Sequence, residues 1–268
     1  MITKEEFTKT YNELKNSGCK NTEIAFKLGI SIESFYQYRR KFGLPNRNDT
    51  RYLRKFNVND EYFSIPNEEN CYWAGFIAAD GTIINNKILT IKLCYLDIEL
   101  LEKFLLAINS NNPIRRYKTK LGKDQVVITI YSKQICEDLK RNFGIIQNKT
   151  FLLKENSLTD KNLIDYYIKG YIDGDGCISV KKKNGITVHL TGTQKLLHWF
   201  NLRFSDILKR KANSLSKRSK SKIYQSRYDN KSGRSIFLHF YNLKFGLNRK
   251  WSYDTYNYCF NWKRKERF

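Results

Sequence analysis

Proline and methionine are scarce in this sequence: three Pro and one Met occur among 268 residues. The six Cys show no CxxC spacing and the three His join no Cys/His cluster, so a zinc site is not predicted and reduced thiols are expected. No apolar run approaches the roughly 20 residues that span a bilayer, and the first residues, MITKEEF, lack the apolar core of a signal peptide. We expect an intracellular protein of the cytoplasm or an organellar matrix, neither secreted nor inserted in a membrane.

Acidic residues are also few, since 26 Asp and Glu face 49 Lys and Arg and leave a net charge of +23. The excess is uneven, because residues 181–268 carry 22 basic and 4 acidic side chains, which is +18 of that total. Such a charge predicts a polyanionic partner, and nucleic acid is the usual one. A lysine-rich surface produced by compositional bias is the alternative, since Lys, Asn, Ile, Tyr and Phe are all plentiful.

A nine-residue pattern occurs twice, as WAGFIAADG in residues 73–81 and as IKGYIDGDG in residues 168–176, and it places Asp80 and Asp175 95 residues apart. Aromatic residues precede each copy and a β-rich run follows it. This order predicts a helix that stops sharply before a strand. Small residues four positions apart leave a bare stripe on each helix, which predicts close packing of the two helices. The stripe residues are Gly75, Ala79, Gly170 and Gly174.

The last two residues of each copy predict a functional site in addition to the helix packing. Gly81 and Gly176 stand where left-handed helix caps are expected, which places Asp80 and Asp175 at the helix C-termini. A carboxylate there faces the negative end of the helix dipole, at a cost of roughly 0.3–1 kcal/mol. Two such carboxylates side by side favour a cation between them, and their hard oxygens suit Mg²⁺. The pair therefore predicts a metal site.

At these residues the sequence resembles the LAGLIDADG homing endonucleases, in the form that carries two motif copies on one chain. The resemblance extends from about Tyr72 to the C-terminus. It implies an α+β fold of tandem, pseudo-twofold αββαββα halves, with the motif helices along the axis and antiparallel sheets forming a saddle. It implies that Asp80 and Asp175 hold divalent metal, Mg²⁺ or Mn²⁺, over the scissile phosphates. The first copy departs from the motif with Ala78, where the second keeps Asp173, and this position lies outside the metal-binding one.

The resemblance also implies a basic or amide side chain beside the metals, and we expect Lys133 and Gln194 in these catalytic roles. Both begin predicted helices, and we expect the two helix starts to correspond to each other in the two halves.

The hydrophobic pattern predicts the same order of elements twice. The halves are expected at residues 70–144 and 166–268, joined by a connector at 145–165. Expected strands of the first half lie near residues 87–95, 115–120 and 125–131, and those of the second near 177–182, 186–191, 222–228 and 235–241. Basic side chains on the strand faces and in the preceding linker are expected to contact DNA. They are Arg51, Arg54, Lys92, Arg115, Lys118, Lys120, His189, Lys222 and Arg227.

Residues 1–44 predict a separate all-α unit, followed by a basic linker at 45–69. Thr3 and Glu6 suggest a capping box. From Asn21 the pattern fits a helix-turn-helix, with Gly29 in the turn and Ser31 as N-cap, and it resembles the small DNA-binding modules of regulators and some nucleases. A purely structural three-helix cap is the alternative. Side chains expected to be exposed on the second helix, and to meet DNA, are Gln37, Arg39, Arg40 and Lys41.

Taken together, these features predict a monomeric, phage- or intron-encoded endonuclease that binds a long specific duplex and hydrolyses one phosphodiester in each strand with Mg²⁺ or Mn²⁺. One alternative is a maturase that binds intron RNA. The other is a transcription regulator that has lost catalysis. Retention of both Asp80 and Asp175 favours the nuclease.

Overall fold

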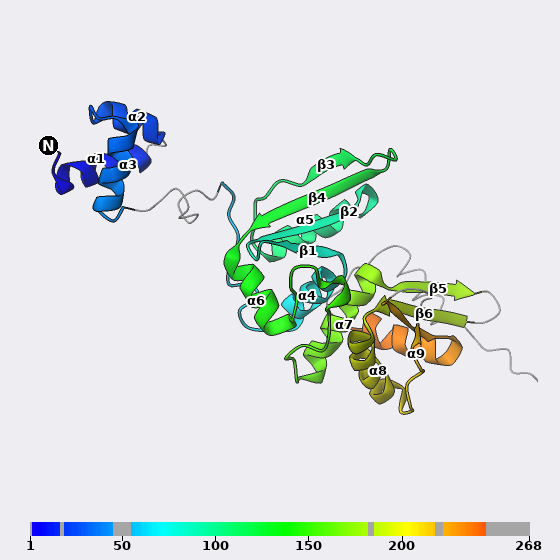
Figure 1. The fold of residues 1–268 in the computed structure, drawn as a ribbon. Helices are drawn as coiled ribbons and strands as arrows, with labels where there is room; N and C mark the ends of the chain where they lie inside the picture. Colours follow the sequence, from blue (N-terminus) through cyan, green and yellow to red (C-terminus); the bar gives the residue numbers. More distant parts are fainter. Residues whose placement is uncertain (1, 17–18, 45–54, 182–184, 218–221, 245–268) are drawn as a thin grey trace, which may run out of the picture. The chain divides into compact units, whose positions relative to one another are not determined.

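The computed structural model of the chain describes residues 2–16, 19–44, 55–181, 185–217 and 222–244. The chain divides into two compact units, Met1–Lys55 and Phe56–Phe268 (Figure 1). Each has a hydrophobic core of its own. Among the described residues, no helix is both long and apolar enough to cross a membrane.

The first unit consists, in its described part, of α1 (Lys4–Asn16), α2 (Asn21–Lys27) and α3 (Ile32–Lys41). Thr3 Oγ1 accepts a hydrogen bond from the Glu6 amide at 3.2 Å, and Ser31 Oγ accepts one from the Ser34 amide at 3.1 Å, as the cap patterns predicted. Gly29 adopts the positive φ of +64° that the turn between α2 and α3 requires. The buried core of this unit consists of Phe7, Tyr11, Ile24, Ala25 and Phe35.

The second unit repeats one arrangement of helices and strands. Its first half contains α4 (Glu68–Asp80), β1 (Gly81–Ile84), β2 (Ile88–Cys94), η2 (Tyr95–Asp97), α5 (Ile98–Ala107), β3 (Arg115–Lys118), β4 (Asp124–Tyr131) and α6 (Lys133–Phe143). After η3 (Lys149–Phe151), the second contains α7 (Lys161–Asp175), β5 (Cys177–Lys181), β6 (Gly185–Gly192), α8 (Gln194–Leu208), β7 (Ser216–Lys217), β8 (Tyr224–Tyr228) and α9 (Asn230–Tyr241). The antiparallel sheets have the orders β1-β2-β4-β3 and β5-β6-β8-β7, which are the same order. The predicted tandem αββαββα fold is confirmed.

One predicted strand is wrong, because residues 235–241 belong to the helix α9. The missing strand of the second sheet is the short β7. Ile236, Phe237 and Phe240 are buried, and their spacing of one and four residues is helical rather than alternating. Gly233 lets α9 approach β6 closely, since a Cβ at this residue would lie 2.2 Å from Ile186 O.

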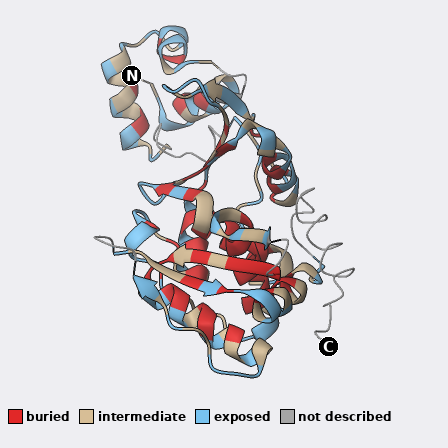
Figure 2. Cartoon of the chain, turned by 90° about the vertical axis from the view of Figure 1, so that its right-hand side faces the viewer, coloured by how far each residue is buried: buried red, intermediate tan, exposed pale blue. Residues whose placement is uncertain are grey.

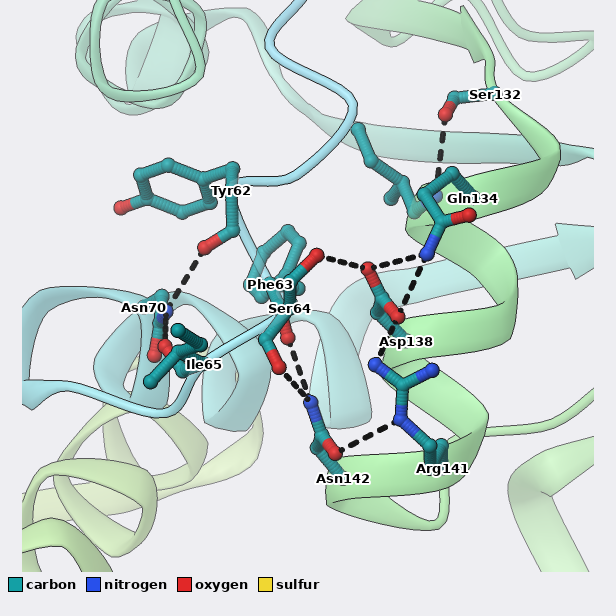
Figure 3. A network of polar contacts seen from close by, with 11 residues as sticks. Tyr62, Phe63, Ser64, Ile65, Asn70, Ser132, Gln134, Asp138, Arg141 and Asn142 are labelled. Carbon is teal, nitrogen blue, oxygen red and sulfur yellow. Dashed lines mark hydrogen bonds and ion pairs between the residues drawn. The ribbon is translucent and has the colours of Figure 1, made fainter.

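The linker predicted at 45–69 is too long, because residues 56–67 pack into the second unit (Figure 3). Phe63 is fully buried. Asn142 Nδ2 on α6 donates to Phe63 O at 2.7 Å and to Ser64 O at 3.0 Å, and Asn70 Nδ2 on α4 donates to Ile65 O at 2.8 Å. Buried Asp138 accepts a hydrogen bond from Ser64 Oγ at 2.8 Å. These bonds satisfy a segment that has no regular structure to satisfy its own backbone.

The connector predicted at 145–165 also ends earlier than expected. Helix α7 begins at Lys161, and the side chain of its N-cap, Asp160, accepts a hydrogen bond from the Asn162 amide at 2.8 Å.

The helices α4 and α7 cross at the centre of the second unit, where both are buried along most of their length (Figure 2). A Cβ at Gly75 would lie 1.9 Å from Tyr167 O, and a Cβ at Gly170 would lie 1.9 Å from Tyr72 O. The two contacts are reciprocal, because each joins the same two positions of the repeated pattern. Only glycine permits this approach, so the predicted interface of small residues is confirmed, together with its pseudo-twofold symmetry.

The left-handed caps predicted at the helix ends are wrong. Gly81 has φ −77° and ψ 157°, and Gly176 has φ −76° and ψ 150°, so both are extended. The chain passes directly from each helix into a strand and needs no reversal at the glycine. What these positions require is the absence of a side chain, since a Cβ would lie 2.6 Å from Ile77 Cγ2 at Gly81 and 2.3 Å from Ile172 O at Gly176.

Candidate functional site

The two predicted metal ligands lie at the same end of the two crossed helices. Asp80 is the last residue of α4 and half-buried, and Asp175 is the last residue of α7 and exposed. A Cβ at Gly174 would lie 3.2 Å from Asp80 Oδ2 and 2.4 Å from Ala79 Cβ, so the Asp80 carboxylate lies against the residue that precedes Asp175. The small residues of the stripe thus bring the two carboxylates together.

A buried lysine that the sequence did not single out joins this site. Lys149, in η3, is 9% exposed, and its Nζ donates to Ala78 O at 2.6 Å and to Ala79 O at 2.8 Å. Both carbonyls belong to the last turn of α4, where backbone oxygens lack helical partners and carry the negative end of the dipole. The ammonium therefore offsets negative charge at the helix end.

Lys149 is also coupled electrostatically to both carboxylates. Burial lowers the pKa of Lys149, and the charges of Asp175 and Asp80 oppose that shift. Desolvation by the surrounding protein raises the pKa of Asp175, and the charge of Lys149 works against it. Two negative charges and one positive charge thus share the site.

This set of groups fits a hard divalent cation that retains water. Among the described residues, no group of three or more His, Cys, Asp or Glu forms a metal-binding cluster. An ion here would be held by the two carboxylates, with water or phosphate oxygens as its remaining ligands. Mg²⁺ is commonly bound in this way, whereas Zn²⁺ and Ca²⁺ usually take more ligands from the protein.

Asp173, the additional acid of the second copy, is engaged in hydrogen bonds to other side chains rather than in the candidate metal site. Its carboxylate accepts hydrogen bonds from Lys169 Nζ at 2.8 and 2.9 Å, from Tyr72 Oη at 3.0 Å and from Tyr241 Oη at 2.9 Å. The network links α7 to α4 and α9 and is buried. Asp173 is therefore structural, and Ala78 in the first copy removes no ligand from the site.

The predicted correspondence between Lys133 and Gln194 is wrong. Lys133 begins α6, which follows the fourth strand of its half, whereas Gln194 begins α8, which follows the second strand of its half. Lys133 follows the end of β4, which lies level with Ile84, at the end of β1 that is remote from Asp80. Gln194 follows the end of β6, a strand that continues past His189, the residue that pairs with Cys177. Both side chains are exposed, and Lys133 pairs with Glu137 at 3.2 Å. A catalytic role for either residue stays a prediction.

Each sheet has one face covered by the core and an outer face, and the register decides which basic residues share the outer one. In the first sheet Lys92 and Arg115 both lie opposite Val127, and both are exposed on the outer face. Lys118 lies three residues beyond Arg115 on β3 and therefore on the opposite face, so it does not share the outer face with Arg115, and its contact with DNA stays a prediction. Lys120 lies in the turn between β3 and β4.

The outer face of the second sheet starts directly after Asp175. Cys177, His189 and Arg227 lie side by side on β5, β6 and β8 and form one row across the sheet. Cys177 and Arg227 are exposed, and His189 is half-buried. Lys222 is exposed just before β8. His189 and Arg227 therefore share the outer face of the second sheet, and their contact with DNA stays a prediction.

Three of the four residues predicted to be exposed on α3 are so, namely Gln37, Arg40 and Lys41. Arg39 is the exception and is 5% exposed, with its guanidinium carbon 5.2 Å from the centre of the Tyr36 ring. Its predicted exposure is wrong, because it lies four residues after Phe35 on the buried side of the helix. Arg51 and Arg54 lie outside the described residues.

No protein-family model and no curated protein sequence matches the chain. The fold is similar to that of a single lysine-to-alanine mutant of I-SmaMI, with a TM-score of 0.50 and 14% identity over 72% of this chain and 91% of that chain. It is equally similar to a double lysine-to-alanine mutant of the same protein, with a TM-score of 0.50 and 12% identity over 73% of this chain and 91% of that chain. I-SmaMI is a LAGLIDADG homing endonuclease. The N-terminal LAGLIDADG domain of DUF199/WhiA is similar at a TM-score of 0.45 and 13% identity over 71% of this chain and 90% of that chain. At these identities the similarity establishes the fold alone.

Proposed function

We propose that this chain, which has the LAGLIDADG fold, is a site-specific endonuclease that hydrolyses one phosphodiester in each strand of duplex DNA. The observation that carries the proposal is the placement of Asp80 and Asp175 at the same end of the two crossed helices, where the charge of Lys149 interacts with both. Anions gathered at two helix C-termini weaken the fold, and binding of a divalent cation to them provides the reason for their presence.

The substrate is inferred from charge and from the sheets. Outer-face side chains of both sheets, among them Lys92, Arg115 and Arg227, supply cations to a surface that extends from the carboxylates. A protein that neutralises several phosphates binds DNA by releasing counterions, so its affinity falls steeply as salt rises. Because both halves lie on one chain, a monomer suffices to cover both strands.

In the proposed mechanism, Asp80 and Asp175 hold Mg²⁺ or Mn²⁺. When bound, such an ion lowers the pKa of an attacking water and stabilises the leaving oxygen. Asp80 is fixed by the last turn of α4, which the two hydrogen bonds of Lys149 tie to η3. The charge of Lys149 also interacts with both carboxylates and so limits the cost of holding two anions at one site. Residues 1–44 would add a second contact to the DNA through Gln37, Arg40 and Lys41 on α3.

A catalytically inactive DNA-binding regulator is the second candidate. The position of Lys149 favours it, because an ammonium already hydrogen-bonded at the helix end supplies part of the positive charge that a metal would bring.

The test begins with selection of bound sequences from a random duplex library by the full chain in Ca²⁺, which occupies carboxylate sites but should support little cleavage. The selected site is then placed in a supercoiled plasmid and incubated with Mg²⁺, Mn²⁺ or EDTA. The proposal predicts linear plasmid with Mg²⁺ or Mn²⁺ and none with EDTA. A selected site that is bound but never cut would establish the regulator instead, and binding without any sequence preference would refute both candidates.

A further inference from the structure

Arg227 is held in one orientation on the outer face of the second sheet. Its Nε donates to Asp229 Oδ2 at 2.9 Å and its Nη2 donates to Asp229 Oδ1 at 3.0 Å. Thr187 Oγ1, on the neighbouring strand β6, donates to the same Oδ1 at 2.5 Å. Asp229 is also the N-cap residue of α9, so the backbone that carries it is fixed by the helix that follows. The arginine is therefore anchored through Asp229 to β6 and α9.

This anchoring determines which donors of Arg227 face outward. A guanidinium has five N–H donors in a rigid plane. Asp229 accepts hydrogen bonds from the edge of the guanidinium formed by Nε and Nη2. Within the described part of the chain, no side chain accepts a hydrogen bond from the edge formed by Nη1 and Nη2. Two parallel N–H donors thus remain on a side chain that is 53% exposed and lies on the outer face beside His189. Because the orientation is set before binding, little side-chain entropy remains to be lost.

Two parallel donors in one plane match the hydrogen-bond acceptors that only one of the four bases presents in the major groove. Guanine presents two acceptors there, O6 and N7, whereas adenine presents one acceptor beside a donor, thymine one acceptor and cytosine a donor. A phosphate also offers two acceptors, but it offers them equally at every sequence. We infer that Arg227, oriented by Asp229 and Thr187, reads a guanine in the half-site bound by the second half, an inference that rests on the proposed binding of duplex DNA.

The row of the sheet also gives an approximate place for that guanine. Arg227 lies two strands away from Cys177, which follows Asp175 and Gly176 directly. Two strand spacings are roughly 10 Å, and this distance corresponds to about three base-pair steps along one strand. The guanine is therefore expected about three base pairs from the cut on that side.

The test compares sequence preferences of the full chain and its variants by selection from a random duplex library in Ca²⁺, followed by affinity measurements on single-base variants of the selected site. Arg227→Ala should abolish one guanine preference and leave the other positions unchanged, with discrimination at that position falling by roughly 5- to 150-fold. Arg227→Lys keeps the charge without the rigid pair of donors, so it should restore overall affinity but only part of the preference. Asp229→Asn should broaden the same position.

Arg116 is the matched control. It pairs with Asp124 at 3.4 Å and is 54% exposed, but it lies opposite buried Val126 on the core-side face of its sheet, with its guanidinium 3.8 Å from the centre of the Tyr95 ring. Arg116→Ala should leave every base preference unchanged.

An equal loss of affinity for all sequences in Arg227→Ala, with a smaller salt dependence, would mean a phosphate contact and would overturn the inference. An unchanged profile would also overturn it, because Arg227 would then be a surface ion pair only. Cleavage of the selected site by the wild-type chain separates the two claims. If the wild-type chain does not cut the site but Arg227→Ala loses the guanine preference, only the proposed endonuclease activity is refuted. If the wild-type chain cuts the site but Arg227→Ala keeps the wild-type sequence preference, only this inference is refuted.

Discussion

Gly75→Ala should destabilise the second unit, although the same change within an ordinary helix stabilises it by about 1 kcal/mol. The added Cβ would lie 1.9 Å from Tyr167 O and 2.8 Å from Tyr167 C. Even a close C–H···O contact needs roughly 3.3 Å between carbon and oxygen, so α4 and α7 must separate by more than about 1 Å. The obstacle is backbone, which no rotamer change relieves.

The expected size follows from these terms. Overpacking of a core costs about 1–3 kcal/mol. A backbone obstacle belongs near the upper end, and the helix-propensity gain leaves a net loss of about 2 kcal/mol. For a unit of this size, that loss corresponds to a fall in Tm of about 4–8 °C. Differential scanning calorimetry of the full chain measures it from the transition of the second unit.

The pseudosymmetry gives a sharper version of the same experiment. Gly170→Ala should cost about as much, since its Cβ would meet Tyr72 O at 1.9 Å. The double variant should lose less than the sum, because one separation of the helices relieves both contacts. Gly174→Ala is the matched comparison: its nearest obstacle is the Ala79 side chain at 2.4 Å, so adding Ala79→Gly should recover most of the loss. A raised Tm for Gly75→Ala would refute the close crossing of the two helices.

Three further predictions concern the site, the core and the first unit. Lys149→Met keeps the apolar stem but removes both hydrogen bonds to α4, so it should slow plasmid cleavage by roughly 100-fold while DNA binding measured in Ca²⁺ persists; cutting at an unchanged rate would exclude Lys149 from the site. Burial raises the pKa of Asp165, but hydrogen bonds from His239 and Arg203 outweigh burial and hold the pKa below its ordinary value. The stability that this carboxylate contributes is therefore present at neutral pH. It is lost as the pH falls through the folded-state pKa. Asp165→Asn should therefore cost about 3 kcal/mol at pH 7 and flatten the acid limb of the Tm–pH curve, and an unchanged acid limb would contradict this assignment. Removal of residues 1–55 should weaken binding of the selected site without abolishing metal-dependent cutting, and a truncated chain that folds and binds its site unchanged would show that the first unit is not a DNA reader.

Local patterns predicted what is determined locally. The caps at Thr3 and Ser31, the turn at Gly29 and the start of α6 at Lys133 depend on neighbouring residues, and the sequence displays them. The repeated pattern was equally informative, because two copies of a bare stripe that ends in a carboxylate have few other uses.

What failed depends on tertiary contacts. Lys149 is one lysine among many in an aperiodic segment, and only the folded chain brings it to the end of α4. The residues of α9 contain enough apolar side chains to suggest alternation, and their packing against β6 decides in favour of a helix. Lys118 is an exception, because its separation of three residues from Arg115 already places the two side chains on opposite faces of a regular strand. Asp229 gave no signal at all, since its importance lies in orienting another side chain.

The central claim is that Asp80 and Asp175 bind the metal that cuts DNA, and plasmid cleavage by Asp80→Asn and Asp175→Asn tests it most directly. Asn keeps the shape and one acceptor oxygen but removes the charge. Neither variant should lose stability, because each removes an anion from a helix C-terminus, and both should still bind the selected site in Ca²⁺. The account predicts that wild-type protein linearises the supercoiled plasmid with Mg²⁺ and that neither variant does, with nicked circles as the most that either produces. Linear product from both variants at near wild-type rates would contradict it.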